Sequence, residues 1–139
     1  MLFPKKVKYR KWHTMRRNPS RVGPATRGIN VSFGSFGLKA LSAGRITSNQ
    51  IESARKAITK AIGKTGRVWI RIFPDMPFTK KPAEVKMGKG KGDIEGYVAR
   101  VLPGQIMFEV DGAAQNIAEE SLRKGGTKMP VKTRIVARS

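Results

Sequence analysis

The chain has 139 residues, which fits a single domain, and its 29 lysines and arginines against 9 aspartates and glutamates give a net charge of +20. Such a surplus favours a polyanionic partner, with nucleic acid the first candidate and an anionic membrane surface the second, because neutralised phosphates release condensed counterions. The absence of cysteine excludes disulfides and thiolate metal sites, and no apolar run in the sequence approaches the ~20 residues that span a bilayer.

Residues 1–28 are predicted to form an extended basic N-terminal arm. No acidic residue precedes Glu52, and Pro4, Pro19 and Pro24 discourage regular structure in the arm. Its cations are suited to phosphates and its rings to stacking on bases. The arm residues that we expect to contact RNA are Lys5, Lys6, Lys8, Arg10, Lys11, Trp12, His13, Arg16, Arg17, Arg21 and Arg27. A solvated tail and an organelle transit peptide are the alternatives.

Residues 29–139 are predicted to form a single RNA-binding domain. It opens with a strand from Ile29 to about Leu41, which we expect to be kinked or bulged at Gly34 and Gly37.

A helix is predicted to begin after Thr47, because the sequence from Thr47 to Gln50 fits a capping box. It is expected to end at Gly63. Its predicted apolar face consists of Ile51, Ala54, Ala57, Ile58, Ala61 and Ile62. The basic residues that we assign to RNA contact on this helix are Arg55, Lys56, Lys60 and Lys64. For the lysine row, a merely solvated helix face is the alternative.

Aliphatic side chains occupy every second position from Val68 to Ile72. This two-residue period predicts a strand from Val68 to Phe73 that ends at Pro74. A long, projecting Gly-Lys loop is expected over residues 76–93. Glycines there let the backbone approach a phosphate closely while lysines supply charge. The loop lysines assigned to RNA contact are Lys80, Lys81, Lys86, Lys89 and Lys91. A nucleotide phosphate loop is disfavoured, because no Gly-Lys-Ser/Thr lies between a strand and a helix.

The last third of the chain is predicted to hold a hairpin, a helix and a strand. The hairpin pairs Tyr97–Leu102 with Gln105–Val110 across a Pro-Gly turn. The helix runs from about Ala114 to Lys124, and a strand follows from Met129 to Val136. Residues Ile117, Ala118, Ser121 and Leu122 are expected to face inward on this helix, with Gly125 at its C-cap. The predicted fold is therefore α+β, a two-layer sandwich with a mostly antiparallel sheet and two helices on one face.

Few residues in the chain are suited to catalysis. His13 is the only histidine and lies in the arm, so no nucleophile–base pair or zinc site can be assembled from His and Cys. The spaced carboxylates Asp93/Glu95 and Glu109/Asp111 are best interpreted as partners of the surplus cations. We expect no enzymatic activity, cofactor, metal or small-molecule substrate.

Several segments in order along the chain resemble the family of bacterial large-subunit ribosomal protein L16. They are Met1 to Lys5, Lys8 to Lys11, Val31 to Ala40, Gln50 to Arg55, Trp69 to Asp75, Met87 to Gly92 and Pro130 to Thr133. The sequence departs from the family at Lys86, where many members have an arginine that is hydroxylated in some of them. That modification is therefore in doubt here.

The resemblance implies a structural role in the large ribosomal subunit of a bacterial-type cytoplasmic ribosome. Its implied partners are large-subunit ribosomal RNA, transfer RNA near the A and P sites, and neighbouring ribosomal proteins. It implies that the arm and the Gly-Lys loop reach toward transfer RNA and that the protein supports late assembly and translation. It implies no membrane partner. A free-standing nucleic-acid-binding or regulatory protein is the alternative, since charge alone would suffice for it.

Overall fold

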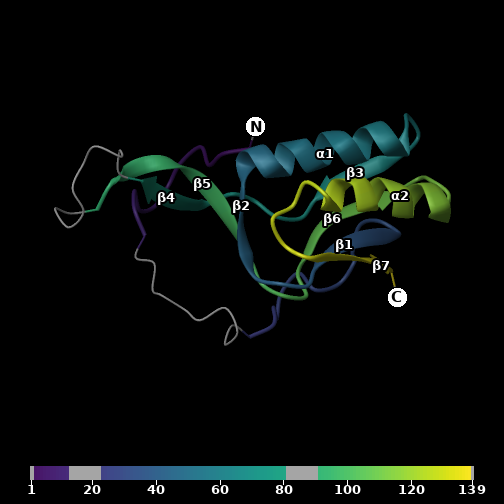
Figure 1. The fold of residues 1–139 in the computed structure, drawn as a ribbon, viewed down its shortest axis with the longest axis horizontal. Coiled ribbons are helices and arrows are strands. Elements are labelled where there is room, and N and C mark those ends of the chain that lie inside the picture. The colour runs from purple at the N-terminus through teal and green to yellow at the C-terminus, as the bar shows by residue number, and fades with distance from the viewer. Residues whose placement is uncertain (1, 13–22, 81–90, 139) are drawn as a thin grey trace.

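The computed structural model describes residues 2–12, 23–80 and 91–138 (Figure 1). These residues form two helices and seven strands. The elements are β1 (Phe36–Ala40), β2 (Gly44–Thr47), α1 (Ser48–Ile62), β3 (Arg67–Ile70), β4 (Met76–Lys80), β5 (Asp93–Val101), β6 (Ile106–Asp111), α2 (Gln115–Gly126) and β7 (Thr133–Ala137).

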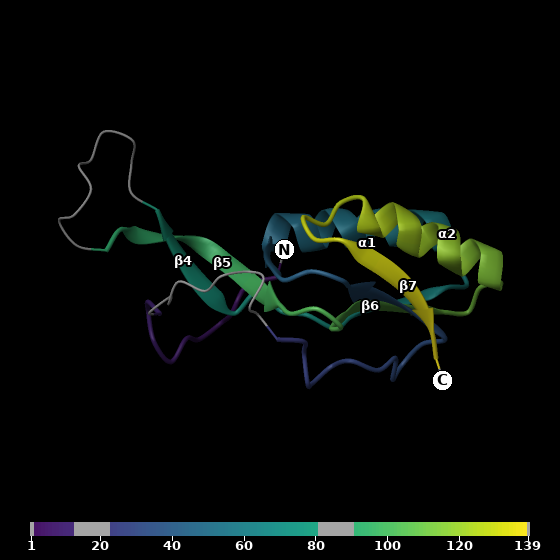
Figure 2. The same ribbon diagram turned by 60° about the horizontal axis from the view of Figure 1, so that its bottom comes forward.

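The strands form two antiparallel sheets. The larger sheet has the order β3-β6-β1-β7, and the smaller one has the order β2-β5-β4. Helices α1 and α2 lie side by side over one face of the larger sheet, while β4 and β5 extend away from the layered part (Figures 1 and 2). The α+β prediction with two helices on one face is confirmed, although we expected one sheet and the strands divide into two.

The core lies between the two helices and the larger sheet. Helix α1 buries Ile51, Ala54, Ile58 and Ile62, and α2 buries Ala118, Ser121, Leu122 and Gly125. A Cβ atom at Gly125 would lie 2.5 Å from Cγ1 of Ile58, so this glycine allows the two helices to pack closely. The sheet contributes Leu38, Phe108 and Val110, each completely buried.

The predicted start and end of α1 are confirmed. The Gln50 backbone N–H donates to the Thr47 hydroxyl, and the Gln50 side chain accepts from the Thr47 N–H at 2.9 Å. Gly63 ends the helix with a φ of 87°, a value that favours glycine.

The predicted hairpin is wrong. Strand β5 pairs with β2 and β4, whereas β6 pairs with β1 and β3. A tight turn does exist, because the Gln105 N–H donates to the Leu102 carbonyl and Gly104 has a φ of +97°. However, the Gly104 N–H donates to the Ala40 carbonyl, which directs the chain from the smaller sheet into the larger one.

The strand expected from Ile29 is also shorter than predicted. Only Phe36–Ala40 is a strand, and residues 31–35 cross the face of the larger sheet that the helices leave open (Figure 2). The close approach explains the glycine at position 34, where a Cβ atom would lie 2.4 Å from the Val110 carbonyl oxygen.

The segment of residues 76–93 is not loop at its ends. Met76–Lys80 forms β4, which pairs with β5 from Asp93 onward. Met76 and Pro77 are buried in this pairing, so a proline from the expected loop sits inside a strand.

Three other predicted boundaries need correction. Strand β3 ends at Ile70 rather than near Phe73, although the Arg71 N–H still donates to the Met107 carbonyl. Strand β7 begins at Thr133, four residues later than expected. In α2, Ile117 is 44% exposed, because the buried face is centred on Ala118 and Leu122, and Gly125 lies within the helix rather than at its cap.

Candidate nucleic-acid interface

Part of the arm lies against the smaller sheet. The Lys91 ammonium donates to the Trp12 carbonyl, and the Lys11 ammonium lies 3.5 Å from the Lys91 carbonyl oxygen. The Arg100 guanidinium of β5 sits 5.3 Å from the centre of the Trp12 ring. Cations from the arm and from the segment before β5 therefore gather at one place, which we call the arm–sheet surface (Lys11, Trp12, Lys91 and Arg100).

The smaller sheet carries a second accumulation of charge. Arg45 of β2 and Arg100 of β5 are direct cross-strand partners, and both are exposed. Like charges directly opposite each other destabilise an isolated sheet. An anion bound there would remove that cost, so the pair indicates a phosphate-binding position beside the arm–sheet surface.

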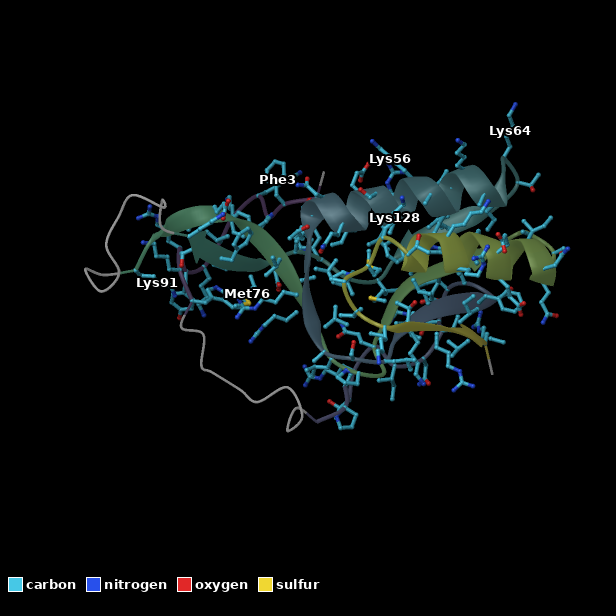
Figure 3. All side chains as sticks on the ribbon, in the orientation of Figure 1. Phe3, Lys56, Lys64, Met76, Lys91 and Lys128 are labelled. Atoms are coloured by element: carbon cyan, nitrogen blue, oxygen red, sulfur yellow. The ribbon has the colours of Figure 1, made fainter. Side chains whose placement is uncertain are left out.

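Helix α1 and the turn directly after it carry a separate row of cations, called here the lysine row of α1, although Lys64 was expected on the helix and lies two residues beyond its end. Lys56, Lys60 and Lys64 are exposed, and Lys64 lies at the opposite end of the molecule from Lys91 (Figure 3). Arg55 is different, because it forms an ion pair with Glu52 at 2.5 Å. The hydrogen bond between them lowers the pKa of Glu52 and raises that of Arg55. The charge of Arg55 is therefore partly neutralised within the protein.

A buried carboxylate holds the crossing segment on the open face of the larger sheet. Oε1 of Glu109 accepts hydrogen bonds from the backbone N–H groups of residues 32, 33 and 34 at 2.9, 2.8 and 3.0 Å. Its Oε2 is paired with Arg71. Burial by itself raises the pKa of Glu109, but the N–H of Gly34, the Arg71 side chain and the N–H of Phe33 together leave it lowered.

The second carboxylate of the pair, Asp111, is also occupied. It accepts from the Ser35 hydroxyl at 2.7 Å and from the Gly112 N–H at 2.8 Å. These hydrogen bonds, with the charges of Arg138 and Arg67, lower its pKa. Glu109 and Asp111 therefore act as structural acceptors. The sequence interpretation anticipated a cation for this pair but missed the backbone donors, because nothing local links residues 32–34 to residue 109.

The predicted RNA-contacting residues divide into three groups. Most of the described ones are exposed, namely Lys5, Lys6, Lys8, Arg10, Arg27, Lys56, Lys60, Lys64, Lys80 and Lys91. Lys11, Trp12 and Arg55 are partly buried. Those outside the described residues are His13, Arg16, Arg17, Arg21, Lys81, Lys86 and Lys89.

Sequence reasoning missed Arg45 and Arg100, whose like-charge pairing is visible only once the strand register is known. Among the described residues, no group of three or more His, Asp or Glu side chains is arranged to hold a metal ion. No helix in the described part of the chain is long and apolar enough to cross a membrane.

Comparison with known proteins gives a match over nearly the whole chain. The sequence profile of the family described as ribosomal protein L16p/L10e matches residues 4–136. The chain is 56% identical to a protein of Acidiphilium cryptum (strain JF-5) over 138 residues, which cover 99% of this chain and 97% of that protein. Identity to relatives from Chelativorans sp. (strain BNC1) and Paracoccus denitrificans (strain Pd 1222) is 54% and 55%, with 99% of this chain and 98% of each relative covered. All three are named large ribosomal subunit protein uL16.

Proposed function

Because this chain belongs to the ribosomal protein L16p/L10e family, we propose that it binds large-subunit ribosomal RNA as a structural constituent of the large ribosomal subunit. The observation that carries the RNA-binding role is the arm–sheet surface, where Lys11, Lys91 and Arg100 converge around Trp12. Converging like charges are costly in an isolated protein, and a polyanion removes that cost.

The arm–sheet surface and the lysine row of α1 lie in separate regions of the molecule (Figure 3). Two separated basic surfaces are suited to joining two RNA segments rather than to coating one duplex. This arrangement supports a role in organising folded RNA during the assembly of the subunit.

Hydroxyl-radical probing of large subunits reconstituted with and without the protein tests this function. We expect backbone protection of ribosomal RNA at two or more sites, because the two basic surfaces are separate. Identical cleavage patterns in both particles would refute RNA binding in the subunit.

A finer proposal is that the arm–sheet surface lies near transfer RNA. It is supported by the basic arm and by the Trp12 ring, which offers a stacking surface beside cations. Transfer-RNA binding to subunits that contain Arg100→Ala should weaken while ribosomal-RNA protection by the α1 row persists. Wild-type transfer-RNA affinity in these subunits would exclude this placement.

The alternative of a free-standing nucleic-acid-binding protein rests on charge alone. Sucrose-gradient sedimentation at moderate salt separates the two functions. A ribosomal constituent is expected almost entirely in the large-subunit fraction, whereas a free-standing binder would leave a pool at the top of the gradient. The absence of enzymatic activity stays a prediction.

A further inference from the structure

The open face of the larger sheet carries a pair of stacked aromatic rings, of which one is exposed and the other is half-buried. Alternation along β3 places Val68 and Ile70 against the core and Trp69 on the opposite face. The Phe33 ring stacks on Trp69 with centroids 6.3 Å apart and planes inclined by 21°. Phe33 is nevertheless 56% exposed, so one ring of the stack is available to a further planar group.

The stack is held in place by the Glu109 network. The Phe33 N–H donates to Glu109, and Arg71, which is paired with the same carboxylate, places its guanidinium 5.2 Å from the Phe33 ring centre. Arg71 also donates to the Asn30 carbonyl at 3.2 Å. The backbone and the ring of Phe33 are therefore both ordered before any partner arrives, which reduces the entropy lost on binding.

The surroundings of the stack are basic. Arg67 lies on the same face of β3 as Trp69, two residues away. Farther along the same face, Lys39 of β1 and Arg134 of β7 are direct cross-strand partners of like charge. The two carboxylates of this face within the described residues are Glu109 and Asp111, and both are occupied by donors.

We propose that Phe33, Trp69 and Arg71 form a stacking platform for an unpaired base of large-subunit ribosomal RNA, separate from the arm–sheet surface and from the lysine row of α1. An exposed, preordered ring beside cations is the arrangement by which proteins bind single-stranded RNA, since every base has a flat face and a phosphate beside it. The inference rests on the proposed function. A neighbouring protein on the same face is the competing occupant, and its apolar side chain would not need the cations.

The test compares full-length variants for binding to deproteinised large-subunit ribosomal RNA over a range of salt concentrations. Phe33→Leu keeps apolar bulk but removes the aromatic face, so we expect affinity to fall about five- to 150-fold, the range typical for removal of one stacked base. The salt slope should stay unchanged, because no charge is removed. Phe33→Tyr keeps a stacking ring and should bind like the wild type.

The matched control is Ile117→Ala, which removes an exposed apolar side chain on α2, a helix that covers the opposite face of the larger sheet. It should bind RNA like the wild type. Thermal unfolding of each variant verifies that the fold is kept, and Phe33→Tyr provides the comparison if Phe33→Leu proves unstable. Loss of affinity in both Phe33 variants would refute stacking.

Wild-type affinity of Phe33→Leu would overturn the platform while leaving RNA binding intact. If Phe33→Leu then also joined reconstituted subunits poorly, the open face would contact a neighbouring protein instead. By contrast, failure of the wild type to bind this RNA in preference to duplex DNA would refute the proposed function itself.

Discussion

Glu109 shows how one side chain connects distant parts of the sequence. Its carboxylate is completely buried and is surrounded by three backbone N–H groups and one guanidinium. A buried charge is tolerated only with such partners. In this protein the partners also order the segment that carries Phe33, so stability and the proposed stacking platform depend on the same group.

We expect Glu109→Gln to lower the free energy of unfolding by about 1–3 kcal/mol, because a neutral amide leaves Arg71 without its counter-charge and weakens bonds to the backbone. Urea unfolding at neutral pH measures the change. Glu119→Gln, at an exposed position on α2, is the control and should be nearly neutral. Equal stability of the two variants would contradict the structural role of Glu109.

The stabilising role of Glu109 should also be visible in the pH dependence of the free energy of unfolding. The pKa of Glu109 is lowered in the folded protein from its ordinary value of 4.5. The contribution of Glu109 to stability is therefore fully present above its ordinary pKa and is lost as the pH falls through the lowered folded-state pKa. Between neutral pH and pH ~3, wild-type stability should fall more steeply than that of Glu109→Gln. Parallel curves would mean that Glu109 does not titrate in this way.

Gly34 provides a steric test of the crossing segment. A Cβ atom there would lie 2.4 Å from the Val110 carbonyl oxygen, so Gly34→Ala must displace the segment from the sheet. We expect stability in thermal or urea unfolding to fall by about 1–3 kcal/mol. Gly23→Ala is the matched control, since nothing lies within 4 Å of its Cβ position. A neutral Gly34→Ala would show that the segment is not held against the sheet.

Among the elements, α1 is the one that local signals define best. The capping box, the apolar spacing and the terminal glycine all agree, and the structure confirms them. Each of these signals involves residues that are close in sequence, so it can be recognised without knowing the rest of the fold.

Ile58→Asp tests the buried face of α1. Ile58 is completely buried and faces Gly125 of α2. An unpaired charge at this position should unfold the domain, which circular dichroism and thermal denaturation would detect. Ser53→Asp, at an exposed position on the same helix, should retain the folded spectrum. A folded Ile58→Asp protein of wild-type stability would mean that the helix packs on another face.

The strands illustrate where local signals fail. Strands β5 and β6 have the alternation and the Pro-Gly turn of a hairpin, yet they belong to different sheets. A turn constrains the chain direction over a few residues. The choice of partner is made by more distant groups, such as the Ala40 carbonyl that accepts from Gly104. Similarly, Pro77 belongs to a segment that was expected to be a loop but is accommodated inside β4.

At the scale of the whole molecule, the positive charge is divided among distinct surfaces. We expect Lys89→Ala combined with Lys91→Ala to weaken RNA binding and to reduce the salt slope by about one for each phosphate that is no longer neutralised. The control is Lys124→Ala with Lys128→Ala, which removes the same charge outside the predicted interface. An unchanged slope for the Lys89/Lys91 pair would mean that these lysines are merely solvated, and an equal reduction for both pairs would show that only net charge matters.

Composition, short-range periodicity and motif order were enough to predict a polyanionic partner, an α+β fold with two helices and a resemblance to one ribosomal family. All three kinds of signal can be followed along the chain without knowing how it packs. The strand partners, the role of Glu109, and the meeting of Trp12 with Arg100 and of Phe33 with Trp69 became visible only in the folded protein. Those contacts join residues that are distant in sequence, and strand register and burial, which create them, are properties of the packed chain.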